Sequence, residues 1–279
     1  MNRLAVTVNP SGTGQAKSNR RKINSLAEQY PMRIEVDSHT HTIASGHAYS
    51  TLAENIKSAS TRGIKLLAVT DHGPQMPGAP HFWYFMNMRV IPRIMYGVGV
   101  LRGVEANIIN TKGELDIDEA IHQQMDIVLG SLHEPIIFPS KTTAHTKAVI
   151  KAMASGKIDI FAHGGNPAFP IDAVEIAKAA THYKVLVEIN NSSFTTSRQG
   201  SKKNCIALAE AVASQGGYLT FGSDAHIAER VGDFKECVNL IKAIGIPKKR
   251  ILSRKGEKFL QFLKSKNKKT DLSEFDTLF

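Results

Sequence analysis

Histidine and carboxylate side chains recur along this chain directly after short apolar runs rich in valine, isoleucine and leucine. Six of the eleven histidines stand at such places, in the motifs DSHTH, VTDHG, GSLHEP, FAHGG and GSDAH. A glutamate, Glu105, takes the same place in GVEAN. A single histidine after a strand is usually structural. The same placement after six of seven runs predicts one shared site, because the carboxyl ends of the strands of a parallel barrel meet at one rim.

The spacing within two of these motifs has a geometric meaning. His39 and His41 are two residues apart, as are Asp224 and His226. On an extended backbone, residues i and i+2 point to the same side, so each pair can reach one cation. His47 follows in a loop rich in glycine and serine. The candidate metal ligands are therefore His39, His41, His47, His72, Glu105, His133, His163, Asp224 and His226.

The chemistry of this ligand set predicts the class of metal and of substrate. Imidazoles and carboxylates without a thiolate favour zinc, manganese or iron over magnesium or calcium. Nine ligands exceed what one metal needs, so we expect two or three metals, with Glu105 able to bridge. Such a site is strongly electropositive and selects an anion. We therefore expect a small phosphorylated substrate whose phosphorus is attacked by a metal-bound hydroxide.

Further polar side chains near these motifs could assist. Arg198 and Arg89 are candidates to hold a substrate phosphate, and His81 either lines the mouth of the pocket or simply packs. Asp37 and Asp71 each lie within two residues of a candidate ligand. They either orient an imidazole from behind or serve in turns.

The apolar runs predict seven strands, at 34–38, 65–70, 99–105, 126–132, 158–162, 184–189 and 218–222. Helices are predicted at 51–62, with Ser50 as the N-cap, and at 142–155, 171–182 and 204–215. One or two more helices are expected over 234–266, around Pro247. Gly63, Gly156 and Gly216 follow helices and suit left-handed C-caps. Strands that alternate with helices predict βα units in an α/β fold, arranged as a closed or nearly closed barrel. The alternative is an open, doubly wound sheet.

Composition places the chain among ordinary globular proteins, with 279 residues, 42% of them hydrophobic and 22% charged. No apolar run reaches the roughly 18 residues of a membrane span, and the first 30 residues lack the apolar core of a secretory signal. We therefore expect a cytoplasmic protein with no membrane partner. Cys205 and Cys237 are predicted to be reduced thiols outside the metal site.

The net charge of +10 resides at the two ends of the chain. Residues 1–35 hold six lysines and arginines against two acidic residues, and residues 242–279 hold eleven against four. The body is near neutral, so a nucleic-acid partner is not expected, because such folds carry basic charge in the domain itself. We expect a basic, disordered N-terminal extension over 1–33, a hydrolase domain over 34–265 and a polar C-terminal tail over 266–279.

Taken in order, DSHTH, TDHG, GVEAN, LHEP, AHGGNP, NNSSF and GSDAH resemble the metal-binding motifs of the polymerase and histidinol phosphatase (PHP) superfamily. The likeness is greater to its YcdX-type phosphatases and covers roughly residues 34–262. The resemblance implies a distorted seven-stranded (β/α) barrel with a trinuclear site, usually of zinc, at the C-terminal ends of the strands. It also implies phosphoester hydrolysis and a homotrimer.

The resemblance implies a division of the ligands among three metals. The sets are His39, His41, Glu105 and Asp224 for the first, Glu105, His133 and His163 for the second, and His47, His72 and His226 for the third. The residues expected to act in catalysis are His39, His41, Glu105, Asp224 and His226.

Three features depart from the family pattern. Ser38 stands where relatives usually carry an apolar residue. Gly164 stands where they usually carry proline, which predicts a looser loop after His163. Residues 1–31 precede the usual start, for which Met32 is a natural position. Two other functions stay open: a nucleic-acid-binding or phosphodiesterase/exonuclease PHP module, and a metal-binding protein without catalytic activity.

Overall fold

The computed structural model of the protein describes residues 32–266 and 268–279, and its centre is a seven-stranded parallel sheet. Neighbouring strands in the sheet follow one another in the order β1-β2-β4-β5-β6-β7-β8. Their bounds are Val36–Asp37, Leu66–Val69, Val98–Asn107, Ile127–Ser131, Ile160–Phe161, Leu186–Asn190 and Leu219–Gly222. Each of the seven predicted strands is present, and all run parallel, as βα units require.

The two edge strands of this sheet approach each other at their carboxyl ends. The Asp224 N–H donates to the His39 carbonyl at 2.9 Å, and the His41 N–H donates to the Ala225 carbonyl at 2.9 Å. The Ser38 hydroxyl spans the same seam and donates to the Phe221 carbonyl at 3.0 Å. The sheet is therefore a nearly closed barrel, as predicted, and not an open doubly wound sheet. Ser38 has a structural use at a position where an apolar side chain would leave that carbonyl without this donor.

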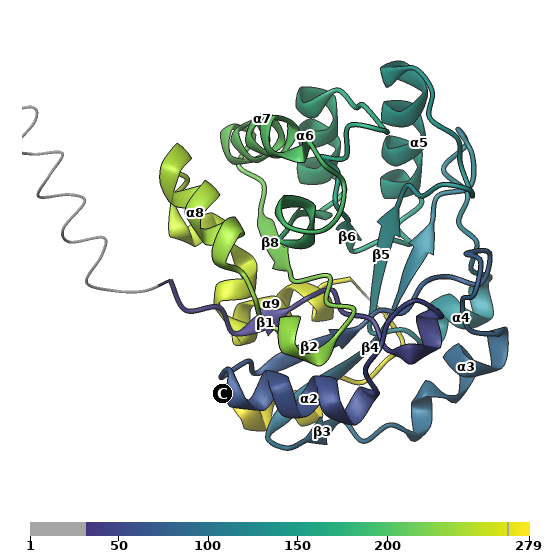
Figure 1. Ribbon diagram of the computed structural model, residues 1–279, viewed down its shortest axis with the longest axis vertical. Helices are drawn as coiled ribbons and strands as arrows, with labels where there is room; N and C mark the ends of the chain where they lie inside the picture. The colour runs from purple at the N-terminus through teal and green to yellow at the C-terminus, as the bar shows by residue number, and fades with distance from the viewer. Residues whose placement is uncertain (1–31, 267) are drawn as a thin grey trace, which may run out of the picture. The chain divides into compact units, whose positions relative to one another are not determined.

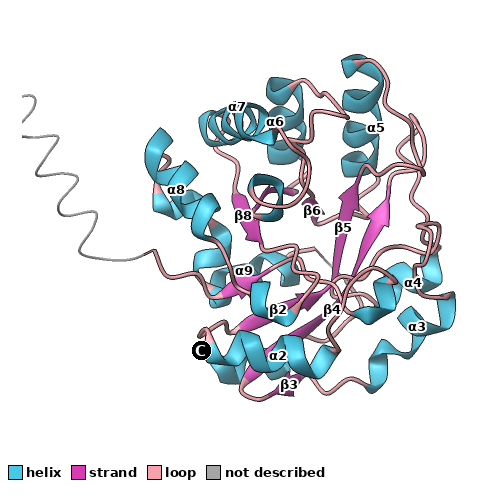
Figure 2. Ribbon diagram, in the orientation of Figure 1, coloured by secondary structure: helices cyan, strands magenta, loops and turns pink. Residues whose placement is uncertain are grey.

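Helices surround the barrel (Figures 1 and 2). The longer ones are α2, α5, α6, α7, α8 and α9, at Leu52–Thr61, Thr142–Ala154, Ala173–His182, Ser201–Ser214, Lys235–Ile244 and Gly256–Lys264. They confirm the predicted helices, with Pro247 between the last two. The N-cap of α2 is Thr51 and not Ser50, because Thr51 forms a reciprocal capping box with Glu54.

One short strand and two short α-helices were not predicted. β3, at Ile94–Met95, pairs antiparallel with β4 through a tight turn in which Tyr96 and Gly97 both have positive φ. The helices α3, at Phe82–Asn87, and α4, at Glu119–Gln124, span six residues each. Elements this short contain too few turns to show a periodic apolar pattern.

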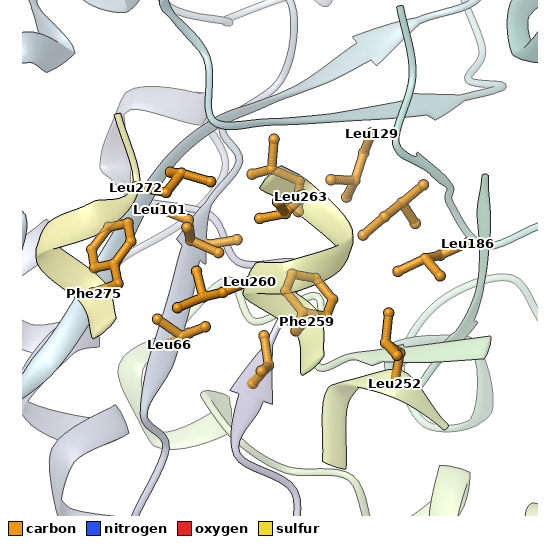
Figure 3. Close-up of a cluster of buried hydrophobic side chains, with 14 of the residues drawn as sticks. Leu66, Leu101, Leu129, Leu186, Leu252, Phe259, Leu260, Leu263, Leu272 and Phe275 are labelled. Atoms are coloured by element: carbon orange, nitrogen blue, oxygen red, sulfur yellow. The ribbon is translucent and has the colours of Figure 1, made fainter. Parts of the chain in front are cut away.

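The hydrophobic core fills the amino-terminal half of the barrel. Side chains of α9, including Phe259, Leu260 and Leu263, lie among leucines from β2, β4, β5 and β7 (Figure 3). Leu272 and Phe275 join this cluster and are buried. The stretch 266–279, expected to be a polar tail, therefore packs against the barrel where the structure describes it. Its few apolar residues lie three apart and turn to one side in the 3-10 helix Ser273–Leu278.

The predicted N-terminal extension lies outside the described residues, apart from residues 32 and 33. Within residues 32–266 and 268–279, none of the helices combines the length and the apolarity that crossing a bilayer requires.

Candidate metal centre

The nine predicted ligands converge at the carboxyl ends of the strands. Glu105 lies on β4 itself, and most of the others lie in the loops that leave β1, β2, β5, β6 and β8. Two of them have unusual backbones: His163 has φ of 33° and Asp224 has φ of 54°. Positive φ is uncommon for residues other than glycine, and such conformations gather at functional sites. These turns re-aim the two side chains toward the centre of the barrel mouth.

Four of the residues form a compact group at the seam between β1 and β8. The Nε2 atoms of His39 and His41 lie 3.0 Å apart. The Oε2 atom of Glu105 is 3.3 Å from His39 Nε2 and 3.5 Å from His41 Nε2. Asp224 Oδ1 is 3.2 Å from His41 Nε2 and 3.6 Å from His39 Nε2. The i, i+2 spacing of the two histidines therefore does turn both rings to one point.

A second group surrounds the other oxygen of Glu105. Its Oε1 atom lies 2.7 Å from His163 Nε2 and 3.3 Å from His133 Nε2. The two Nε2 atoms are themselves 3.2 Å apart. Glu105 therefore faces one group of side chains with each of its oxygens, as a bridging ligand would.

The remaining histidines lie beside the first group. The Nε2 atoms of His47 and His72 are 3.3 Å apart, and the ring centroids of His47 and His226 are 4.9 Å apart. His41 also lies close, with its ring 4.4 Å from those of both His72 and His226. The structure thus brings all nine predicted residues together. Three overlapping triples each have their ligand atoms within 4.8 Å of one another: His41, His72 and His226; His39, His41 and Glu105; His72, Glu105 and His133.

Most of the ligand set is electrostatically prepared for cations. The exception is His39: burial opposes its protonation, but the carboxylates around it, Glu188 first, raise its pKa well above the ordinary value. Burial would raise the pKa of Glu105, but the histidines around it, His133 first, hold that pKa well below its usual range. Burial, and after it the charge of His72, lowers the pKa of His41 well below its usual value. Burial and the Arg198 guanidinium lower the pKa of His163 to about 4. Ionised carboxylates and neutral imidazoles are the forms that bind metals.

Unpaired polar atoms provide a test of whether the residues fit a metal. Among the described residues, His72 Nδ1 and Glu105 Oε2 are buried without a hydrogen-bond partner, although they lie 2.9 Å apart. Buried polar atoms are nearly always paired, so unpaired atoms within a cluster of typical metal ligands fit a site for a bound ion. The donor set therefore fits divalent cations that accept imidazole and carboxylate ligands.

Glu188, which we did not predict, supports the site from behind. Its Oε1 atom accepts from His39 Nδ1 at 2.9 Å, and its Oε2 atom accepts from the His163 N–H at 2.8 Å and from Asn190 Nδ2 at 3.1 Å. The side chain is buried on β7. A signal was present in the sequence: Glu188 interrupts the apolar run KVLVEIN, two residues after the inward-facing Leu186.

Further side chains contact the Nδ1 atoms of other candidate ligands. Asn107 Oδ1 accepts from His133 Nδ1 at 2.8 Å, and the Ser45 hydroxyl oxygen lies 3.1 Å from His41 Nδ1. Asp37 instead serves the backbone, since it accepts from Ser223 N at 3.0 Å and Gly232 N at 2.8 Å. Of the two aspartates considered, Asp37 therefore fills the turn role, and burial raises its pKa to about 6.

A pocket of about 460 Å³ lies over the cluster. Arg198 lines it and pairs with Asp224, and its Nε donates to Ser193 Oγ at 3.0 Å. His81 and Arg89 lie elsewhere. His81 is exposed and caps α3, accepting from the Trp83 N–H at 3.3 Å. Arg89 lines a separate apolar groove with Trp83. Of the three predicted substrate residues, the structure brings Arg198 alone to this pocket.

The loop after β6 is tightly packed. A Cβ added at Gly164 would lie 2.3 Å from Phe161 Cε1. The Asn166 N–H donates to the His163 carbonyl at 3.1 Å, which closes the turn. The looser loop expected from glycine at this position is therefore not what the structure shows.

A family model and several known proteins match the sequence of this chain. The model of the family described as PHP domain matches residues 37–245. A protein of Aeromonas hydrophila named probable phosphatase is 50% identical over 237 residues, which cover 85% of this chain and 96% of that protein. A protein of Shewanella piezotolerans with the same name is 53% identical over 235 residues, covering 84% and 95%.

A solved structure with a similar fold is histidinol phosphate phosphatase from Lactococcus lactis, complexed with zinc, L-histidinol and phosphate. The TM-score is 0.51 at 17% identity, and the match covers 76% of this chain and 94% of that one. At this level of identity, the likeness concerns the fold.

Proposed function

This chain belongs to the PHP domain family, and from that membership we propose that it is a metal-dependent phosphatase that hydrolyses a small phosphomonoester at a trinuclear site. The observation that carries the proposal is the convergence of nine imidazole and carboxylate side chains beneath one pocket. The curated relatives, which match nearly their whole length, are named probable phosphatases. The near-neutral body of the chain supports a small substrate over a nucleic acid.

The three ligand sets implied by the family resemblance are part of this proposal. His39, His41, Glu105 and Asp224 would hold the first metal, Glu105 with His133 and His163 the second, and His47 with His72 and His226 the third. The short distances from Glu105 to both neighbouring groups support a bridging role. Zinc is the proposed metal, with manganese or iron as alternatives that take the same ligands.

Bound divalent cations would polarise the phosphoryl oxygens and acidify a water molecule for in-line attack. The residues of the chain supply the rest. Glu105 and Asp224 are the two carboxylates of the ligand set. The positive charge of three divalent cations would exceed the negative charge of these two side chains, so the loaded site would attract an anion. The volume of the pocket, about 460 Å³, suits a small ester. A histidine binds a metal through one ring nitrogen. A hydrogen bond from its other ring nitrogen to a protein group would fix the orientation of the ring during the reaction.

Arg198 is the proposed contact for the substrate phosphoryl group. Its side chain is 15% exposed and lies at the pocket wall beside Asp224. The Nε and Nη2 atoms of Arg198 donate to Ser193, Asn190 and Asp224, so the contact to a phosphoryl oxygen would come from Nη1. A lysine ammonium cannot reproduce this fixed set of donors. We expect Arg198→Lys to lower kcat/KM by about 10- to 100-fold, since hydrogen bonds to charged groups are worth about 1.5–3 kcal/mol. Unchanged kcat/KM in this variant would remove Arg198 from the substrate site.

One experiment tests the proposal directly. We expect purified protein to carry two to three zinc, manganese or iron ions per chain by mass spectrometry of the metals, and to hydrolyse p-nitrophenyl phosphate. Chelation should abolish turnover and reloading should restore it. His72→Ala should lose turnover and keep its circular dichroism spectrum, which separates catalysis from simple metal storage. One metal or none, with no hydrolysis after reloading, would end the proposal.

Two further properties belong to the proposal: a homotrimer, which the family resemblance implies, and a cytoplasmic location, which is the expectation from the sequence itself. Light scattering on the eluting protein measures the first, with three times the mass of one chain expected. Fractionation of cells that make the protein measures the second, with recovery in the cytoplasmic fraction expected.

A further inference from the structure

A line of hydrogen bonds joins the metal centre to helix α3. His41 Nδ1 lies 3.1 Å from Ser45 Oγ, the Ser45 hydroxyl donates to Asp71 Oδ1 at 2.6 Å, and the Tyr84 hydroxyl donates to Asp71 Oδ2 at 2.5 Å. His41, Ser45 and Asp71 are fully buried. Three separate segments therefore meet behind one candidate ligand: the loop after β1, the end of β2 and α3.

The direction of each bond follows from Asp71. A carboxylate has about four acceptor positions and donates nothing when ionised. Asp71 Oδ1 accepts from the Thr42 N–H at 2.7 Å and from Ser45, and Oδ2 accepts from the Thr42 hydroxyl at 2.9 Å and from Tyr84. All four positions are filled, so each partner must point its proton at Asp71.

The state of His41 follows in turn. The proton of the Ser45 hydroxyl is directed at Asp71, so Ser45 has lone pairs alone to offer to His41 Nδ1. His41 must then carry its proton on Nδ1, because a neutral imidazole donates from one nitrogen and accepts at the other. Its Nε2 atom is left as a bare lone pair, 3.0 Å from His39 Nε2 and 3.2 Å from Asp224 Oδ1.

We propose that Tyr84, Asp71 and Ser45 are positioning residues that fix His41 in the tautomer with Nδ1 protonated, so that Nε2 is presented to the metals. The proposal rests on the metal centre of the proposed function. Tyr84 is the distant member, on a helix that supplies none of the nine ligands. Burial and the Asp71 charge raise the pKa of Tyr84 above its ordinary value, so its hydroxyl keeps the proton that it donates.

The tautomer can be measured in the metal-free, full-length protein through the nitrogen-15 spectrum of its imidazole rings. We expect the wild-type His41 signals to show a protonated Nδ1 and a bare Nε2. In Ser45→Ala, the spectrum should show a mixture of tautomers or the opposite one, and Ser45→Thr, which keeps a hydroxyl, should restore the wild-type pattern. A His41 with Nε2 protonated in the wild type, or unchanged in Ser45→Ala, would overturn the proposal.

Zinc binding provides the second readout, by competition with a chromophoric chelator. Outer partners of metal-bound histidines typically contribute about 10- to 100-fold in metal affinity, so we expect a loss of about that size in Ser45→Ala. Tyr84→Phe should weaken binding by a smaller factor, of about 3- to 10-fold, because Asp71 keeps its other three donors. Tyr183→Phe, on the exposed end of α6, is the matched control and should bind zinc as the wild type does.

Folding is checked by circular dichroism and the melting temperature of each metal-free variant. If Ser45→Ala does not fold, Ser45→Cys takes its place, because the thiol is close in size and a weaker donor. Wild-type zinc affinity in both folded Ser45 and Tyr84 variants would refute the positioning role. A wild-type chain that binds no metal would refute the proposed function instead, while the tautomer spectrum would still decide the hydrogen-bond relay.

Discussion

Replacing Glu188 by glutamine isolates the effect of one buried carboxylate on the metal centre. Glu188 accepts three hydrogen bonds, from His39 Nδ1, the His163 N–H and Asn190 Nδ2. Glutamine has nearly the same shape but a single oxygen, and its NH₂ group donates. If the amide oxygen faces His39, the NH₂ group meets two donors. If the NH₂ group faces His39, that ring must accept at Nδ1 and carry its proton on Nε2, where the first metal would bind.

The magnitude follows from the bonds that are lost. Glu188 makes a charge-assisted bond to His39 at 2.9 Å, with both side chains fully buried. Such bonds contribute about 1.5–3 kcal/mol, and about 1.4 kcal/mol is a factor of ten in an equilibrium constant. We therefore expect Glu188→Gln to weaken zinc binding by about 10- to 100-fold, the range typical of outer partners. The carboxylates around His39, Glu188 first, outweigh burial and raise its pKa well above the ordinary value, so the variant should also lower that pKa.

The assay is the zinc dissociation constant, measured by chelator competition together with kcat for p-nitrophenyl phosphate at saturating zinc. Glu175→Gln is the matched control, because Glu175 lies exposed on α6 and pairs with Lys178. The control should match the wild type in both measurements. If Glu188→Gln binds zinc within twofold of the wild type while folding normally, the carboxylate does not hold His39 and the reasoning fails.

Three further outcomes are expected. Phe275→Ala should lower the free energy of unfolding in urea by about 3–5 kcal/mol, because Phe275 is fully buried, whereas Phe138→Ala, at a side chain that is 72% exposed, should change it little. Burial raises the pKa of Cys205 to about 12 and that of Cys237 well above its usual value, so both thiols stay protonated at pH 8 and should react with Ellman's reagent after denaturation and not before. Gly222→Ala should abolish zinc binding in a competition assay, because its Cβ would lie 1.9 Å from Glu188 Oε1; retained binding would contradict the packing described for β8.

Much of the site could be predicted because side chains alternate along strands. Leu66 and Ala68 of β2 face the inside of the barrel, and His72 lies further along the chain at the same two-residue spacing. On β4 the inward Leu101 leads in the same way to Glu105. A parallel barrel brings all such rows to one rim. Strand position and residue type were therefore enough to name the nine residues that converge.

The places where the structure departs from the sequence expectations have local causes. His81 and Arg89 lie in a long connection whose path depends on α3, a helix too short to show periodicity, and that path takes both away from the pocket over the cluster. The stretch after residue 265 reads as polar by composition. Its few apolar side chains, Leu272 and Phe275 among them, become core because they pack into the cluster that α9 forms with the barrel strands.

The sequence by itself determined the barrel and the residues at its mouth, since both follow from short-range periodicity that any one strand displays. Tertiary structure decided which nitrogen of each imidazole faces the centre, because that depends on partners distant in sequence. Glu188 accepts a hydrogen bond from His39, which is 149 residues away in the sequence. Ser45 contacts His41 and donates to Asp71, which also accepts from Tyr84. A ligand type can be read from one position in a chain, but the direction of a hydrogen bond depends on both of its ends.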